Sequence, residues 1–228
     1  MANLLNRYRE VDKCKEDIQQ FLTIASGDIK NIEQKDAICI IKNMMFIKKT
    51  YSFPDSTKQH YYDCLITDIL TLIHTYSQKS IRVYYTTYRS LIENLVRVIL
   101  RYDNTNATGV RNMFQEFRSK YDATDKAFID YIEGEYGKCC NVVHSNYKAH
   151  LTMYEYYEEI VNADELSIEK LKTYARQLAD FYIKCKKFII NNDVIQVDNA
   201  FHNQREVLKY LIGNIDYGIF LRNIKIAE

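Results

Sequence analysis

The sequence predicts an all-α fold, a single-domain helical bundle, from three features of its composition and pattern. Pro and Gly, which punctuate turns, are scarce: there are one Pro and six Gly in 228 residues, whereas average usage is roughly 12% for the two together. A β-sandwich or barrel needs such residues every 8–12 positions or so. Apolar residues recur instead at three- and four-residue steps, which is the period of an amphipathic helix. The 47% hydrophobic and 27% charged fractions are typical of a folded chain.

The first third of the chain is expected to form three helices. Residues 4–25 follow the helical period, and Gly27 stands where a helix C-cap belongs. The dense apolar run 38–47 indicates a helix that is buried on most sides. Ser56, with Gln59 three residues later, matches a capping box. This pattern predicts a helix that starts there and carries its apolar face over residues 62–76.

Ser80 is expected to open the next helix, which has a broad apolar face over residues 84–102. Its other side carries charges at four-residue steps: Arg89, Glu93, Arg97 and Arg101. Such a row is either a solvated face with Arg–Glu pairs, each worth about 0.2–0.5 kcal/mol, or one wall of a functional site.

The polar stretch 103–109 is the clearest loop in the sequence. A short helix over 110–117 is expected to follow it. Thr124 is expected to cap a further helix that runs to His144, although two glycines weaken its middle.

The last third contains the most regular helical pattern. After a short helix over 151–161, Ser167 opens a heptad-like row that suits either bundle packing or a partner helix. Residues 194–197 are expected to be extended, and a final helix covers 207–212. The apolar tail 215–226 is expected to dock on the protein. The heptad-like row consists of Ile168, Leu171, Ala175, Leu178, Tyr182, Cys185 and Ile189.

Charge and targeting signals restrict the functional classes. Lys and Arg number 31 and Asp and Glu 30, so the net charge of +1 does not draw the protein to nucleic acid or membrane. No apolar run reaches 18 residues, and the N-terminus has no signal-peptide core. The six cysteines lack C-x-x-C spacing. We therefore expect a cytoplasmic protein with reduced thiols and no membrane partner.

Common catalytic motifs are missing from the sequence. It has no glycine-rich phosphate loop, no H-E-x-x-H, no G-x-S-x-G and no EF-hand pattern, so no cofactor is expected. Cys140 and His144 share a helix face, but Cys139 and Cys140 point about 100° apart on a helix. No metal centre is expected either.

His144 is the histidine with the most informative setting. It ends a helix in the run Cys139-Cys140-Asn141-Val142-Val143-His144-Ser145. A helix C-terminus favours a protonated imidazole, which suits a general acid. Alternatively, the ring only caps the last helix carbonyls. The residues alone leave both interpretations open.

Two segments together resemble the HEPN superfamily, which consists of all-α bundles in prokaryotic toxins and phage-defence proteins. One is Tyr88-Arg89-Ser90-Leu91-Ile92-Glu93-Asn94-Leu95 on a long helix, and the other is Asn141-Val142-Val143-His144-Ser145 at the end of a later helix. The resemblance covers roughly residues 56–190. It implies a HEPN-like core on which the N-terminal helices and the C-terminal helix pack, within one domain spanning 1–228.

The resemblance also implies a site. In active HEPN ribonucleases, a dimer joins two Arg-x(4–6)-His motifs. The arginine binds phosphate, the histidine assists cleavage, the RNA 2′-hydroxyl attacks and no metal is needed. Here His144 would be the motif histidine, and Glu93 or Arg89 would be the polar group of the earlier helix.

The motif arginine itself is replaced in this chain. Its three permitted positions hold Gly137, Lys138 and Cys139. Lys138 has the right charge but lacks the planar, bidentate grip of a guanidinium, which Arg89 would have to supply from the other helix. The candidate site residues are therefore His144, Arg89, Glu93, Lys138 and Asn141.

Three hypotheses about function follow from these observations. The leading one is a catalytically degenerate HEPN-like subunit of an anti-phage defence or toxin–antitoxin system. It would assemble with a second copy or a partner protein subunit and contact RNA. The first alternative is a metal-independent endoribonuclease that uses His144, with Lys138 or Arg89 on the phosphate. The second is an unrelated helical protein-interaction module.

Overall fold

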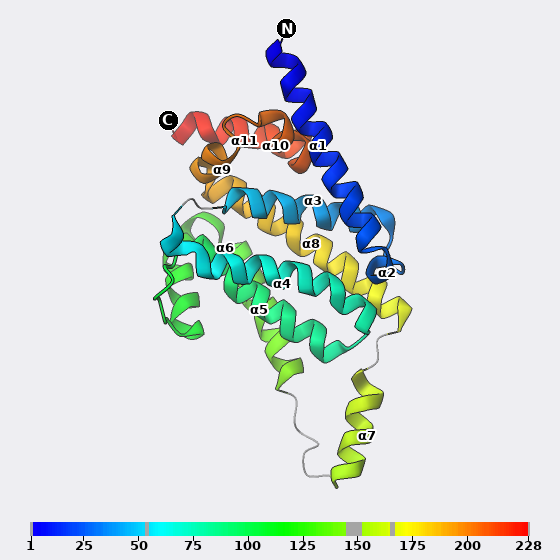
Figure 1. The fold of residues 1–228 in the computed structure, drawn as a ribbon. Helices are drawn as coiled ribbons and strands as arrows, with labels where there is room; N and C mark the ends of the chain where they lie inside the picture. Colours follow the sequence, from blue (N-terminus) through cyan, green and yellow to red (C-terminus); the bar gives the residue numbers. More distant parts are fainter. Residues whose placement is uncertain (1, 53–54, 145–151, 165–166, 228) are drawn as a thin grey trace. The chain divides into compact units, whose positions relative to one another are not determined.

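The computed structural model describes residues 2–52, 55–144, 152–164 and 167–227, and this part of the chain is helical without a β-strand (Figure 1). The predicted all-α fold is confirmed. No helix in these ranges is both long and apolar enough to cross a membrane. The chain divides into two compact units, and each is described separately.

The first unit combines both ends of the chain: residues 1–27, 32–54 and 174–228. Within it, α3 packs against α1, α9 and α10, while α11 packs against α9 and α10. The rings of Phe46 and Phe201 stack with centroids 6.1 Å apart, and both are fully buried. Its helices are α1 (Ala2–Ile24), α3 (Gln34–Thr50), α8 (Ile168–Asn192) from Tyr174 onward, α9 (Val194–Phe201), α10 (Arg205–Ile212) and α11 (Asn214–Ala227).

The second unit consists of residues 28–31 and 55–173. Its centre is α5, which packs along α4 on one side and along α6 on another. In Figure 1, α4 and α5 run antiparallel, side by side. The first two residues of the short α2 (Ser26–Ile29) belong to the first unit and its last two to the second. The other elements are η1 (Ser56–Lys58), α4 (Gln59–Gln78), α5 (Ile81–Ile99), α6 (Val110–Val143), α7 (Met153–Asp164) and the start of α8.

Two of the predicted helix boundaries differ from the structure. Asp55, not Ser56, caps the 3₁₀ turn that precedes α4, because its Oδ1 accepts from the backbone N–H of Thr57 at 2.9 Å. Gly27 lies inside α2 and therefore does not terminate α1. The Ser80 cap is confirmed, since its Oγ accepts from the backbone N–H of Val83 at 3.1 Å.

Helix α6 contains the predicted break, shifted by one residue. The backbone of Asp125 is non-helical (φ −153°, ψ 61°). Its Oδ1 accepts from the backbone N–H of Phe128 at 3.1 Å, so Asp125 caps the second half. Thr124, the predicted cap, donates to the carbonyl of Tyr121 instead. The kink divides α6 into two halves, and the loop 103–109 precedes the first of them.

The heptad-like row of α8 mostly serves the core of this chain. Its residues from Leu171 to Ile189 are at most 1% exposed, and only Ile168 at the helix start is half exposed. The prediction of an extended 194–197 is wrong: α9 is helical because Val197 and Phe201 share one buried face. The tail forms α11, which packs on α9 and α10 as expected.

The single-domain expectation stays a prediction. Residues 55–173 form one continuous stretch of the second unit, and residues 28–31 are its only other part. Each unit has buried apolar residues of its own, such as Phe201 in the first and Phe117 in the second. The candidate site residues all belong to the second unit.

Candidate active site

Helices α5 and α6 bring four side chains together on the second unit. Arg89 Nη1 lies 2.9 Å from Nε2 of His144. Arg89 Nε donates to Oη of Tyr136 at 3.1 Å and to Oε1 of Glu93 at 3.3 Å. Tyr136 in turn donates to the same Glu93 oxygen at 2.8 Å. The guanidinium is therefore held on one edge and presented to the imidazole on another.

Helical spacing explains how these groups converge. Arg89 and Glu93 are four residues apart on α5, while Tyr136 and His144 are two four-residue steps apart on α6. His144 is the C-cap residue, and its N–H donates to the carbonyl of Cys140 at 2.9 Å. Since α5 packs along α6, these two faces meet.

The imidazole Nε2 bonds to Arg89 and not to a helix carbonyl. The carbonyl of Val143, the last residue of α6, accepts from Arg82 Nη1 at 2.9 Å. Arg82 from α5 therefore performs the capping that the sequence offered as an alternative role for the ring of His144. This leaves the imidazole, which is exposed, directed at Arg89.

The chemistry of the guanidinium sets the direction of the Arg89–His144 hydrogen bond. A guanidinium has only donors and keeps its proton in proteins. In this hydrogen bond Arg89 therefore donates and His144 Nε2 accepts, which in the neutral imidazole corresponds to the tautomer with its proton on Nδ1. A neutral imidazole has a lone pair that can accept a proton, so this ring can act as a general base beside the cation.

Burial and hydrogen bonding tune the groups around the guanidinium. The side chains of Arg89 and Glu93 are 28% and 22% exposed. Partial burial lowers the pKa of Arg89, but the hydrogen bond with Tyr136 and the surrounding negative groups raise it overall. Burial, followed by the hydrogen bond to Glu93, raises the pKa of Tyr136. The site therefore holds a permanent cation, and Tyr136 stays a neutral phenol.

Two predicted site residues do not join this cluster. Lys138 pairs with Glu135 at 2.5 Å and is largely exposed. It lies six positions before His144 on α6, which places it about 120° around the helix. Asn141 is exposed and makes no side-chain hydrogen bond within the described residues. Of the five candidates, the structure brings together Arg89, Glu93 and His144.

Tyr136 is the residue that sequence reasoning missed. Four-residue steps back from His144 pass through Cys140 to Tyr136, so helical periodicity was the available signal. Nothing local showed that Tyr136 would reach across to Glu93, which is 43 positions away in sequence.

The rest of the charged row on α5 supports the fold. Arg97 Nη1 donates to the carbonyl of Thr108 at 3.0 Å, and its guanidinium lies 5.0 Å from the ring centre of Tyr61. This anchors the loop 103–109. Arg101 follows the end of α5 with a positive φ of 61°, and the backbone N–H of Tyr102 donates to the carbonyl of Arg97, as in a Schellman motif.

The cysteines next to the site do not form a metal-ligand set. Among the described residues, no group of three or more His, Cys, Asp or Glu side chains is arranged to hold a metal ion. Burial raises the pKa of the Cys139 thiol to about 12.

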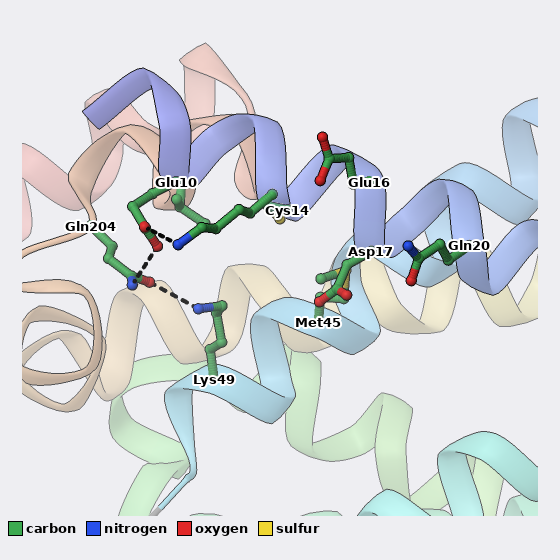
Figure 2. A pocket seen from close by; sticks show the side chains of 10 residues that line it. Glu10, Cys14, Glu16, Asp17, Gln20, Met45, Lys49 and Gln204 are labelled. Carbon is green, nitrogen blue, oxygen red and sulfur yellow. Dashed lines mark hydrogen bonds and ion pairs between the residues drawn. The ribbon is translucent and has the colours of Figure 1, made fainter. Parts of the chain in front are cut away.

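A cavity of about 370 Å³ in the first unit is lined by α1, α3 and α10. Figure 2 shows a chain of hydrogen bonds at one end of the cavity: Lys49 donates to Gln204 at 2.8 Å, and Gln204 donates to Glu10 at 3.4 Å. Lys13 pairs with Glu10 at 2.8 Å. The cations of the cavity, Lys13 and Lys49, are therefore already bonded to its other residues, whereas Arg89 is in contact with a potential general base.

Fold and site together define an all-α protein with an arginine–histidine cluster at the end of a helix. Comparison of the chain with protein-family models, curated proteins and solved structures found no match. The chemistry available to the cluster therefore has to be derived from its geometry. A guanidinium that binds an oxyanion beside a neutral base suits acid–base chemistry at a phosphate.

Proposed function

We propose that the protein is a metal-independent endoribonuclease whose site is Arg89 and His144, positioned by Glu93 and Tyr136. The observation that carries this proposal is the 2.9 Å contact between Arg89 Nη1 and His144 Nε2. The HEPN resemblance supplies the reaction class. Arg89, from the earlier helix, provides the guanidinium that the second helix lacks at residues 137–139.

When the substrate binds, a phosphate oxygen replaces His144 Nε2 as the partner of Arg89 Nη1. Arg89 turns its Nη1 from the imidazole to a phosphate oxygen, which it binds more strongly because that oxygen is charged. His144 Nε2 is then free to accept the proton of the RNA 2′-hydroxyl. Glu93 and Tyr136 keep the other edge of the guanidinium fixed, so the cation needs little reorganisation.

The 2′-oxygen attacks phosphorus, and the bond from phosphorus to the 5′-oxygen breaks. The leaving 5′-oxygen takes a proton from water, and the imidazolium returns its proton to solvent. The products are a 2′,3′-cyclic phosphate and a 5′-hydroxyl. This route needs a 2′-hydroxyl, so RNA is cleaved and DNA is not.

The test is cleavage of end-labelled single-stranded RNA in EDTA. We expect chelator-resistant cleavage that falls about 10²–10⁴-fold in His144→Ala, which removes the base. Arg89→Lys is expected to lose most of the activity, because an ammonium cannot replace the bidentate grip. Tyr136→Phe, which only loosens the guanidinium, is expected to have a smaller defect.

Matched controls come from the first unit. His202→Ala and Arg222→Ala remove the same side chains at exposed positions and are expected to cleave like wild type. Equal cleavage by wild type and His144→Ala would reject His144 as the base. Absence of cleavage with a panel of transfer and single-stranded RNAs would favour the assembly role.

That assembly role is a second candidate, favoured by the surface of α7. Met153, Tyr154 and Tyr157 are at least 69% exposed, which is unusual for large apolar side chains on one helix. Under this hypothesis the protein is a cytoplasmic HEPN-like subunit of a defence or toxin–antitoxin system, and it forms a dimer with a second copy of itself. Light scattering should then show a dimer that Met153→Ser with Tyr157→Ser dissociates.

A further inference from the structure

A pocket of about 350 Å³ opens on α6 next to the Arg89–His144 cluster. It involves both halves of the kinked helix, and Tyr136 belongs both to the pocket and to the cluster. The pocket is lined by Arg111, Phe114, Gln115, Arg118, Glu133 and Tyr136.

The floor of the pocket is aromatic. The rings of Phe114 and Tyr136 have centroids 5.1 Å apart and an interplanar angle of 58°. Gln115, which is exposed, adds an amide with both donors and an acceptor at the rim. Aromatic rings next to an amide in the lining of a pocket suit a planar, hydrogen-bonding ring such as a nucleobase.

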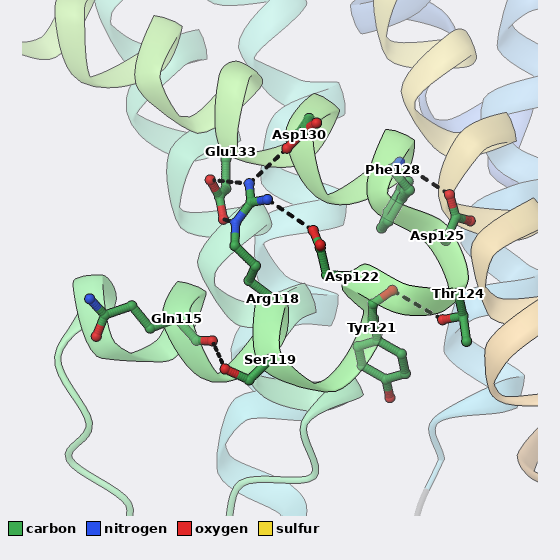
Figure 3. A network of polar contacts seen from close by, with 10 residues as sticks. All are labelled: Gln115, Arg118, Ser119, Tyr121, Asp122, Thr124, Asp125, Phe128, Asp130 and Glu133. Atoms are coloured by element: carbon green, nitrogen blue, oxygen red, sulfur yellow. Dashed lines mark hydrogen bonds and ion pairs between the residues drawn. The ribbon is translucent and has the colours of Figure 1, made fainter.

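Arg118 is used by the fold itself. Figure 3 shows its guanidinium between Asp122, Asp130 and Glu133, at 3.0, 2.8 and 2.9 Å. These carboxylates lie on both sides of the kink at Asp125, so Arg118 ties the two halves of α6 together. Its donors are therefore committed to the protein.

Arg111, in contrast, is not used by the fold. It is exposed, and no carboxylate within the described residues pairs with it. It lies in the first turn of α6, where the helix dipole disfavours a cation. The guanidinium of Arg111 is therefore available to a ligand at the edge of the pocket.

We propose that this pocket binds the nucleotide adjacent to the scissile phosphate of single-stranded RNA. The base lies against Phe114 and Tyr136, and Arg111 binds the phosphate of that nucleotide. This proposal rests on the proposed function, because Tyr136 links the pocket to the catalytic guanidinium. It favours an unpaired strand, since a paired base would first have to be unpaired and unstacked before it could enter the pocket.

The experiment measures binding without cleavage. The probe is a fluorescent single-stranded oligonucleotide with 2′-O-methyl groups throughout, which has no 2′-hydroxyl to attack. Fluorescence anisotropy is recorded for the wild-type full chain, Arg111→Ala and the matched control Arg222→Ala over a range of salt concentrations. A fully paired 2′-O-methyl duplex serves as the second ligand.

We expect Arg111→Ala to weaken single-strand binding about tenfold and to reduce the slope of log affinity against log salt by about 1. Arg222→Ala should bind like wild type, and the duplex should bind more weakly than the single strand. Unchanged binding by Arg111→Ala, equal binding of the duplex, or no binding by wild type would each overturn the pocket.

The outcome is separable from that of the proposed function. RNA cleavage with Arg111-independent binding would keep the ribonuclease and reject the pocket. Arg111-dependent binding of the uncleavable strand by a protein that cleaves no RNA would keep the pocket and reject the ribonuclease.

Discussion

At the scale of single residues, the contact of Arg89 with His144 determines where the imidazole proton lies. A donor-only guanidinium at 2.9 Å from Nε2 requires the proton on Nδ1. We expect ¹⁵N NMR of the neutral ring to show His144 as the Nδ1–H tautomer. Arg89→Ala should abolish this preference. An Nε2–H tautomer in the wild type would contradict the geometry.

Asp68 gives a prediction about pH and stability. It lies on α4 and accepts from Ser90 at 2.8 Å and Asn94 at 2.7 Å on α5. Burial raises its pKa, the two hydrogen bonds lower it, the charge of Glu93 raises it, and the pKa is raised overall. The native state therefore binds this proton more tightly than the unfolded state. The resulting stability is fully present below the unfolded pKa of about 3.9 and is lost as pH rises through the folded value.

Asp68→Asn keeps a neutral acceptor at every pH. We expect it to be at least as stable as wild type at neutral pH, with the difference shrinking toward about pH 4. Asp103 is a control with the opposite sign, because hydrogen bonds from Thr105 lower its pKa. Asp103→Asn should destabilise at neutral pH and lose this effect as pH falls. Urea unfolding at several pH values measures both variants, and a pH-independent Asp68→Asn difference would refute the assignment.

At the scale of elements, α6 depends on the cap at its kink. Asp125 caps the second half, which carries Tyr136 and His144. Asp125→Ala should lower the free energy of unfolding by about 0.5–2 kcal/mol. Thr124→Ala, at the cap position that the sequence suggested, should have a smaller effect, because Thr124 bonds only a preceding carbonyl. Chemical denaturation of both variants distinguishes the positions, and the reverse order of effects would contradict the structure.

The helices themselves were largely predictable from sequence, and the exceptions have physical causes. Periodicity predicted α5 and α8 because long amphipathic stretches bury one face in any fold of this class. The β-branched run at 194–197 suggested an extended segment, but burial of Val197 and Phe201 on one face overrides that propensity. The predicted cap, Thr124, is one residue away from the observed cap, Asp125, because Thr and Asp are both favourable at the N-cap position.

At the scale of the whole molecule, the site was predictable only in part. The sequence supplied His144, Arg89 and Glu93 as candidates, but it could not show that residues 55 positions apart are in contact. That contact results from the packing of α5 on α6. Helix geometry alone places Lys138 about 120° around α6 from His144, whereas the packing brings Tyr136 into contact with Arg89 and Glu93 on α5. Tertiary contact, which local periodicity does not encode, separates the groups that meet from those that do not.

The division into two units leads to a prediction about cooperativity. In the first unit, Lys186 Nζ lies 2.7 Å from Oδ2 of Asp216, and each side chain is only about one tenth exposed. Removing one partner leaves a buried charge unpaired, so Asp216→Ala should cost about 3–5 kcal/mol. Replacing both residues, with Lys186→Met and Asp216→Leu, should recover most of this loss.

Native-state hydrogen exchange then measures which helices lose amide protection in Asp216→Ala. If the units open separately, Asp216→Ala should accelerate exchange in α3, α9, α10 and α11 and leave α4, α5 and α6 protected. We expect this outcome, because the second unit has buried apolar residues of its own. Equal acceleration in all these helices would instead identify the single cooperative domain that the sequence predicted, and it would make the site around Arg89 dependent on an ion pair in the other unit.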